Sequence, residues 1–218
     1  MIRTLFGDDV ADLRYYWTAQ TELDGIPVVI SRTGWTGEVG YEVYLRDPSR
    51  GGDLWDRIIE AGQPHGIRPI APCEARRIEA GIFNYGSDMT IENNPFEVSG
   101  LERLVEPQAA DYVGKAALER IRTEGVSRKL VGLEVAGDAL PFEIDQKRAA
   151  FHRGERVGTV TDLIWSPRLE KNIGYVWVPI ELAGPGIELE IEGPDESRAT
   201  GRTAALPFLD PRKQVPLG

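Results

Sequence analysis

Residues 21–46, TELDGIPVVISRTGWTGEVGYEVYLR, carry the clearest strand pattern in the first half of the chain. The pair Asp24–Gly25 separates two runs of strand-forming residues, and glycine permits the positive φ of a tight hairpin turn. After the glycine-rich stretch 34–40, residues 41–46 alternate, which is typical of a strand with one buried face. The two faces are Tyr41, Val43 and Leu45 against Glu42, Tyr44 and Arg46. The pattern predicts a hairpin followed by a third strand.

Helical patterns surround these strands. Residues 53–62 (DLWDRIIEAG) place four large apolar side chains on one face of an amphipathic helix. These side chains are Leu54, Trp55, Ile58 and Ile59. Further helices are predicted at 8–19, 72–81 and 114–125, and the glycine, proline and asparagine content of residues 84–105 predicts irregular structure.

The pattern changes from Ser127 onward. Short β segments recur there and are separated by turns rich in glycine and proline, which is typical of a small antiparallel barrel or sandwich. The segments are 129–135, 148–152, 156–164, 171–178, 187–192 and 198–208. The sequence therefore predicts an α+β protein with an α+β region at 1–126 and an all-β region at 127–218.

Composition narrows the class of protein. The 218 residues are 41% hydrophobic and 28% charged, as in an ordinary globular protein, and the net charge of -10 argues against nucleic-acid binding. No apolar run is long enough to span a bilayer, so no membrane association is expected. The single cysteine, Cys73, excludes an intrachain disulfide, and two distant histidines give no basis for a metal site. Without a signal-peptide pattern, the cytoplasm is the expected compartment.

Three segments together resemble a known family. The first is residues 31–42, SRTGWTGEVGYE. The second is residues 74–81, EARRIEAG, followed by NYGSDM at 84–89. The third combines residues 157–161 with Ser166–Pro167 and Leu206–Pro207–Phe208. In order and spacing, over nearly the whole chain, they resemble the C-terminal portion of the glycine-cleavage T-protein (aminomethyltransferase) superfamily.

The resemblance implies a fold and an activity. Residues 1–126 would form a partial folate-binding α/β domain of the T-protein type, and residues 127–218 its C-terminal β-barrel domain. The implied function is a tetrahydrofolate-dependent transfer of a methyl or aminomethyl group from a small-molecule donor. Residues 94–97, NPFE, are more similar to the folate-dependent demethylase branch, and IAPCEARRIEAG at 70–81 departs from true T-proteins. The donor therefore stays open.

The catalytic residues are left unassigned. In the family an N-terminal segment supplies the catalytic acid, and this chain begins after the corresponding position. We therefore expect a truncated or split chain, with a homodimer or a separate chain supplying the missing half. The alternative is a non-catalytic folate-binding protein, or an inactive remnant, that associates with another subunit. Without that segment, Ile26, Val28 and Ile30 are expected to lack partners.

Glu42 and Trp35 are the first two candidate cofactor-binding residues. By resemblance, Glu42 matches a glutamate that contacts the pterin, and a carboxylate suits the adjacent 2-amino and N3–H donors of that ring. The competing interpretation is a strand glutamate that faces solvent. Trp35 stands where the family has an aromatic residue, and it could stack on the pterin or pack on the core.

Arg77 and Tyr85 complete the candidate set. Arg77 matches the family arginine before the EAG run, and with Tyr85 it could line the binding cleft. The competing interpretation is that Arg77 forms a structural ion pair with Glu42, Glu79 or Asp88. A separate basic cluster is expected to be a solvated face or a surface that attracts a polyglutamate tail. That cluster comprises Arg120, Arg122, Arg128 and Lys129.

Overall fold

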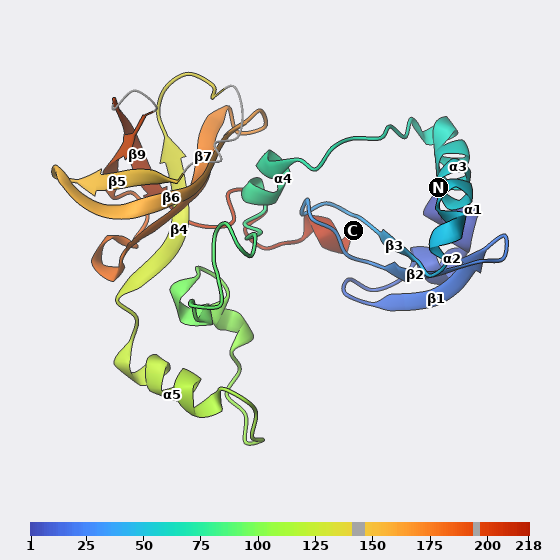
Figure 1. Ribbon diagram of the computed structural model, residues 1–218, viewed down its shortest axis with the longest axis horizontal. Coiled ribbons are helices and arrows are strands. Elements are labelled where there is room, and N and C mark those ends of the chain that lie inside the picture. The colour runs from blue at the N-terminus through green and yellow to red at the C-terminus, as the bar shows by residue number, and fades with distance from the viewer. Residues whose placement is uncertain (141–146, 194–196) are drawn as a thin grey trace. The chain divides into compact units, whose positions relative to one another are not determined.

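The computed structural model describes residues 1–140, 147–193 and 197–218, and it divides into two compact units (Figure 1). One unit, called the sheet unit, comprises Met1–Cys73 with Arg212–Gly218. The other, the barrel unit, comprises Glu74–Pro211. The predicted boundary between residues 126 and 127 lies inside the barrel unit, where the sequence pattern changes. As a domain boundary it stays a prediction.

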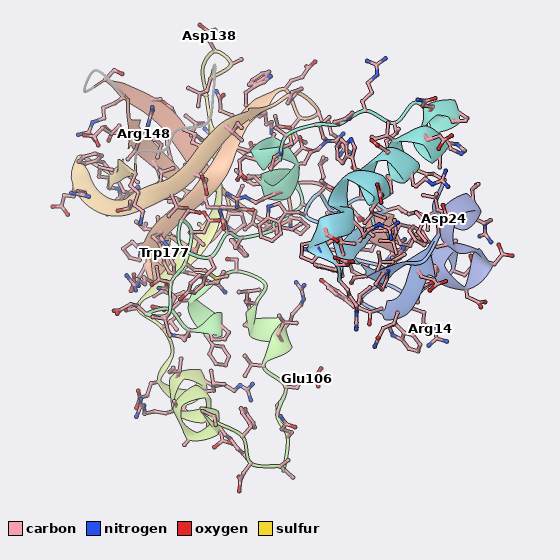
Figure 2. The ribbon with its side chains drawn as sticks, turned by 45° about the vertical axis from the view of Figure 1, so that its right-hand side comes forward. Arg14, Asp24, Glu106, Asp138, Arg148 and Trp177 are labelled. Atoms are coloured by element: carbon pink, nitrogen blue, oxygen red, sulfur yellow. The ribbon has the colours of Figure 1, made fainter. Side chains whose placement is uncertain are left out.

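The sheet unit holds a three-stranded antiparallel sheet in the order β1-β2-β3. Its elements are α1 (Ile2–Phe6), α2 (Asp8–Ala11), β1 (Thr18–Leu23), β2 (Ile26–Ser31), β3 (Glu42–Leu45), α3 (Gly51–Gly62) and the 3-10 turns Pro48–Arg50, Gln63–His65 and Val215–Leu217. Asp24, labelled in Figure 2, and Gly25 have φ values of 50° and 75° in the turn between β1 and β2. These values are the ones a two-residue hairpin needs, so the predicted hairpin is present.

The predicted helix at 8–19 is wrong beyond Ala11. The chain leaves α2 there and joins the sheet at Thr18. The Tyr16 N–H donates to the Arg32 carbonyl at 3.1 Å, and the Arg32 N–H donates to the Trp17 carbonyl at 2.9 Å. Because these bonds extend the β1–β2 ladder, the aromatic run gains strand pairing that a helix would forfeit.

The apolar face of the sheet is covered within its own unit. Ile26, Val28 and Ile30 are fully buried, so the expectation that they would lack partners is wrong. They pack with side chains of α1, α2 and α3, including Val10 and Leu54. The predicted alternation of β3 is confirmed, because its odd-numbered residues face this core. Trp55 was predicted to lie on the buried apolar face of the helix at 53–62, but its side chain is exposed.

The barrel unit is a closed antiparallel barrel preceded by helical segments (Figure 1). Its elements are α4 (Glu74–Glu79), α5 (Lys115–Glu124), β4 (Arg128–Val135), β5 (Arg148–His152), β6 (Glu155–Ser166), β7 (Lys171–Pro179), β8 (Glu188–Glu192), β9 (Arg198–Ala204) and the 3-10 turns Pro95–Glu97, Glu102–Leu104 and Ile180–Leu182. The strand order is β4-β7-β6-β5-β8-β9, and β9 pairs back with β4. The predicted small antiparallel barrel is confirmed.

Two apolar clusters stabilise this unit. One fills the barrel interior with aliphatic side chains from all six strands, such as Leu133 and Ile191. The other joins α4 to the outside of the barrel, where Ile78 packs with Leu130 and Tyr175. Burial of such side chains stabilises a fold by about 1.5–3 kcal/mol each. Within the described ranges, no helix is both long and apolar enough to cross a membrane.

Candidate functional site

Glu42 is placed by a loop that returns the chain to the end of β2. It is the first residue of β3, and its cross-strand neighbour is Ser31, the last residue of β2. Arg32 closes the intervening glycine-rich loop, because its buried Nη1 donates to the Gly40 carbonyl at 3.2 Å. Its guanidinium also lies 5.0 Å from the centroid of the Tyr41 ring. The loop thus presents Glu42 on the polar face of the sheet.

Two hydroxyl groups hold the carboxylate of Glu42. The Tyr44 hydroxyl donates to Glu42 Oε2 at 3.0 Å, and Thr33 Oγ1 donates to the same oxygen. The bond to the carboxylate and its charge raise the pKa of Tyr44, because an ionised tyrosine beside a carboxylate is disfavoured. Neither partner was expected from the sequence, although the strand alternation put Tyr44 on the same face as Glu42.

Trp35 lies in the same glycine-rich loop and is 46% exposed. Both interpretations from sequence, stacking on a pterin and packing on the core, therefore stay open. An exposed indole offers a flat apolar surface on which a planar ring can stack. Its contact with the pterin stays a prediction.

Arg77 belongs to the barrel unit and is fully buried. Its Nη1 donates to Asp88 Oδ2 at 2.8 Å, its Nη2 donates to Asp162 Oδ2 at 2.7 Å, and its Nε donates to Glu74. The structural ion pair with Asp88 that the sequence allowed is therefore present. A contact between Arg77 and a ligand stays a prediction. Such a ligand would have to compete with the carboxylates that already bind all three guanidinium nitrogens.

The carboxylates around Arg77 are not equivalent. Asp88 also accepts from the Asn84 N–H at 2.7 Å and from Thr161 Oγ1 at 2.8 Å. Burial raises the pKa of Asp162 to about 7, with a further rise from its hydrogen bond to Asp88 and the charge of that group, while Arg77 opposes the shift. The site therefore favours the protonated form of the Asp162 carboxyl. No sequence signal pointed to this residue, which lies far from Arg77 along the chain.

Tyr85 follows Arg77 in sequence but lies at the surface of the barrel unit. It is 65% exposed and sits in the turn before Asp88, bridged to Met89. The four candidates are thus divided between the units, with Glu42 and Trp35 in the sheet unit and Arg77 and Tyr85 in the barrel unit. The cofactor role of Tyr85 stays a prediction.

Other residues of the family-like segments have structural roles. Glu79 is buried and accepts from Ser166 Oγ at 2.6 Å, which connects α4 to the end of β6. In the NPFE segment, Asn94 accepts from the Phe96 N–H at 3.0 Å, and Glu97 accepts from the Asn94 N–H at 3.1 Å. This reciprocal pair is a capping box, which satisfies backbone donors at a helix start.

Three residues of the basic cluster have hydrogen-bond partners within the barrel unit. Arg128 donates to Glu97 Oε1 at 3.1 Å and Lys129 donates to Glu102 Oε1 at 3.0 Å. Arg122 donates to the Val105 carbonyl at 2.7 Å. Since these cations already have partners, the expected attraction for a polyglutamate tail gains no support from this arrangement.

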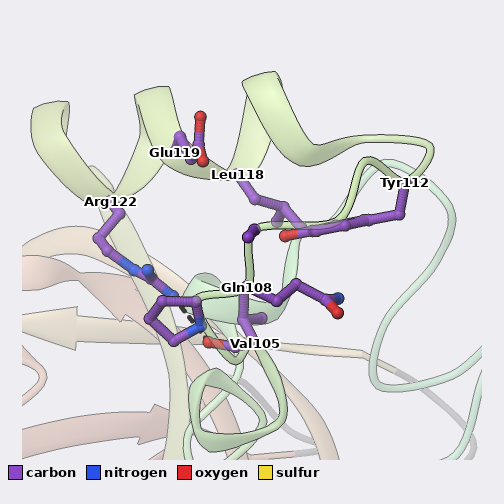
Figure 3. Close-up of a pocket in the computed structure, with 8 residues that line it drawn as sticks. Val105, Gln108, Tyr112, Leu118, Glu119 and Arg122 are labelled. Carbon is purple, nitrogen blue, oxygen red and sulfur yellow. Dashed lines mark hydrogen bonds between the residues drawn. The ribbon is translucent and has the colours of Figure 1, made fainter.

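A cavity of about 330 Å³ lies beside Arg122, between α5 and the segment before it (Figure 3). The labelled residues that line it are Val105, Gln108, Tyr112, Leu118, Glu119 and Arg122. It is lined by none of the four candidate residues, so the cavity and the Glu42 site are separate features.

Comparisons with known proteins bear on the family. The model described as the GCVT N-terminal domain matches residues 1–109, and the glycine cleavage T-protein C-terminal barrel domain matches residues 128–210. A probable aminomethyltransferase of Pyrococcus horikoshii is 33% identical over 98% of this chain and 58% of its own length. The aminomethyltransferase of Desulfitobacterium hafniense is 35% identical over 88% of this chain and 52% of its own length. The dimethylsulfoniopropionate demethylase of Ruegeria pomeroyi is 32% identical over 91% of this chain and 53% of its own length.

A solved structure shows the same fold. The glycine cleavage system aminomethyltransferase T from Bartonella henselae matches with a TM-score of 0.73 and 22% identity, over 92% of this chain and 55% of that one. The chain spans about half the length of the curated relatives it matches. The resemblance inferred from three sequence segments is confirmed over both the sheet and the barrel, and this chain belongs to the glycine cleavage T-protein family.

Proposed function

We propose that this chain acts in the tetrahydrofolate-dependent transfer of a methyl or aminomethyl group from a small-molecule donor. The observation that supports this most directly is the carboxylate of Glu42, held by two hydroxyls on the polar face of the sheet. It stands in the segment whose family resemblance implies a pterin contact. The aminomethyltransferases and the demethylase among the relatives favour the same class of reaction.

The residues present fit a pterin in chemical terms. A pterin edge carries N–H donors, and a half-buried carboxylate accepts such donors with charge assistance. The exposed ring of Trp35 in the same loop could cover the flat face. When bound, tetrahydrofolate would supply the nitrogen that accepts the one-carbon group. The chain's part is to bind and orient this acceptor and to exclude water, which lowers the barrier to a displacement at carbon.

Partners and donor are further parts of the proposal. We infer that a second copy of the chain or another polypeptide of the same family takes part in the transfer. The alternative function is a non-catalytic folate-binding or inactive subunit. A non-catalytic folate-binding subunit would share the Glu42 contact but give no turnover with any methyl or aminomethyl donor, whereas a lack of folate binding would favour the inactive subunit.

Isothermal titration calorimetry with tetrahydrofolate tests the proposal, with the chain alone and with the N-terminal portion of the Desulfitobacterium hafniense relative added. Glu42→Gln keeps the shape but puts a donor where an acceptor is needed, so it should cost about 1.5–3 kcal/mol of binding. Glu38→Gln, in the same loop, is the matched control and should cost much less. Equal losses would show that Glu42 is wrongly assigned. No binding by the wild-type chain under either condition would contradict the transferase proposal.

A further inference from the structure

The hydroxyl groups beside Glu42 form a chain with a definite direction. Thr33 Oγ1 lies 2.9 Å from Ser31 Oγ and within hydrogen-bonding distance of Glu42 Oε2. A hydroxyl has one proton to donate, and an ionised carboxylate can only accept. The Thr33 proton therefore belongs to Glu42, and the buried Ser31 hydroxyl supplies the proton of the contact with Thr33.

This arrangement makes the two carboxylate oxygens of Glu42 different. Oε2 accepts from Thr33 on one side and from Tyr44 on the other. Among the described residues, no hydrogen bond to Oε1 is found. Because Thr33 is half-buried in the loop and Tyr44 stands two residues along β3, the donors come from separate segments and restrain the carboxylate from two directions.

We propose that Thr33 and Tyr44 are positioning residues that hold Oε2 of Glu42, so that Glu42 meets folate through Oε1 alone. The inference rests on the proposed function and deepens it. It replaces the expectation that both oxygens of the carboxylate accept from the pterin. One oriented oxygen makes a directional contact, and the hydroxyls give the side chain its orientation before the ligand arrives.

The orientation has a consequence that a simple structural role lacks. In the E42Q variant, the two hydroxyls can donate to the amide oxygen or accept from its NH2 group, so they no longer determine which end of the side chain faces the ligand. The same two substitutions should therefore weaken folate binding when residue 42 is glutamate and change it little in the E42Q background.

Calorimetry with 5-formyltetrahydrofolate measures this difference between the two backgrounds. T33V and Y44F should each weaken binding about three- to tenfold, the range for loss of one ordinary hydrogen bond. T33S keeps the hydroxyl and should bind like wild type, whereas T21V, on the opposite face of the sheet, controls for loss of a threonine. If T33V/Y44F weakens binding by the same factor with and without E42Q, the hydroxyls act independently of Glu42 and the inference is wrong.

A second measurement does not depend on folate. The pKa of Tyr44, followed by NMR of 13C-labelled tyrosine and assigned with Y44F, should fall toward its ordinary value in E42Q. An unchanged titration would show that Glu42 does not hold Tyr44 and would overturn the positioning role. Absence of folate binding by the wild-type chain would contradict the proposed function and the claim for Oε1, while the titration would still decide the positioning.

Discussion

Arg77 and Asp162 lie 85 residues apart in sequence, and Arg77 Nη2 donates to Asp162 Oδ2 at 2.7 Å with both side chains buried. The bond connects α4 to β6 of the barrel. Asp88 and Glu74 also pair with Arg77, so one cation serves three carboxylates. Because an uncompensated buried charge costs far more free energy than a surface charge, the attachment of α4 to the barrel depends on this guanidinium.

Replacement of Arg77 should therefore be strongly destabilising. We expect Arg77→Met to lower the free energy of unfolding by about 3–5 kcal/mol, because it leaves the carboxylates without their cation. Urea denaturation followed by circular dichroism measures the loss. Arg120→Met is the matched control, since Arg120 pairs with Glu124 at the surface at 3.9 Å and should cost less than about 1 kcal/mol. Similar losses for the two variants would contradict a structural role for Arg77.

The raised pKa of Asp162 predicts a pH dependence of stability with a definite sign. In the folded state the Asp162 carboxyl keeps its proton up to about pH 7, whereas in the unfolded chain an aspartate loses its proton at about pH 4. Between these values the folded state binds more protons, so the unfolding free energy decreases as pH rises, by up to about 1.4 kcal/mol per pH unit. Asp162→Asn mimics the protonated carboxyl and removes this contribution. The stability of wild type relative to the variant should therefore fall from pH 5 to pH 8.

Asp88→Asn is the control for that experiment. Asp88 accepts from Arg77, from the Asn84 N–H and from Thr161, so an amide would set a donor against donors. We expect a loss of about 2–4 kcal/mol at pH 5. The pH dependence should be weaker than in wild type, because Asp88 is one of the groups that raise the pKa of Asp162. Urea unfolding of the three proteins at pH 5, 6, 7 and 8 provides the comparison. A constant difference between wild type and Asp162→Asn over this range would contradict the raised pKa of Asp162.

Local patterns predicted the elements well. The barrel strands follow period-2 runs bounded by turns, and α3 follows a helical period, so residues close in sequence carried the information. The helix expected at 8–19 was wrong beyond Ala11, because Tyr16 and Trp17 pair with Arg32, a contact formed between separate segments. The spacing of apolar residues along one segment carries no information about its pairing with a distant segment.

The candidate site was predicted only in part, for a similar reason. Glu42 came from a family motif, and its strand face came from alternation, but its partner Thr33 is reached across a loop. For Arg77, the sequence offered Asp88 as a partner and gave no sign of Asp162. Buried ion pairs between distant elements leave no periodic signal, because only the folded chain brings the charges together.

Gly81 should tolerate no side chain. Its φ is 65°, and a Cβ would lie 3.2 Å from Pro207, so alanine meets both backbone strain and crowding. We expect Gly81→Ala to lower the unfolding free energy by about 2–3 kcal/mol. Gly114→Ala has a similar positive φ of 91° with open space around it and should cost about 1 kcal/mol. Thermal unfolding of both variants separates crowding from strain, and equal losses would show that the Pro207 contact is unimportant.

Arg32 should control the order of the loop that presents Glu42. Its buried guanidinium bonds to the Gly40 carbonyl and faces the Tyr41 ring, and a lysine could not keep both contacts because it lacks the planar fork. We expect Arg32→Lys to increase amide hydrogen exchange over residues 34–41 and to weaken 5-formyltetrahydrofolate binding about threefold or more.

Arg46→Lys is the matched control for this last experiment. Arg46 donates to Gln20 Oε1 at 2.9 Å at the exposed end of β3, away from the loop, so its replacement should leave exchange at 34–41 unchanged. Exchange mass spectrometry and calorimetry on the same samples distinguish two causes of weaker binding. If binding falls in Arg32→Lys while the loop exchanges as in wild type, Arg32 acts on the ligand directly. If both change together, the closed loop is what keeps the Glu42 carboxylate in place.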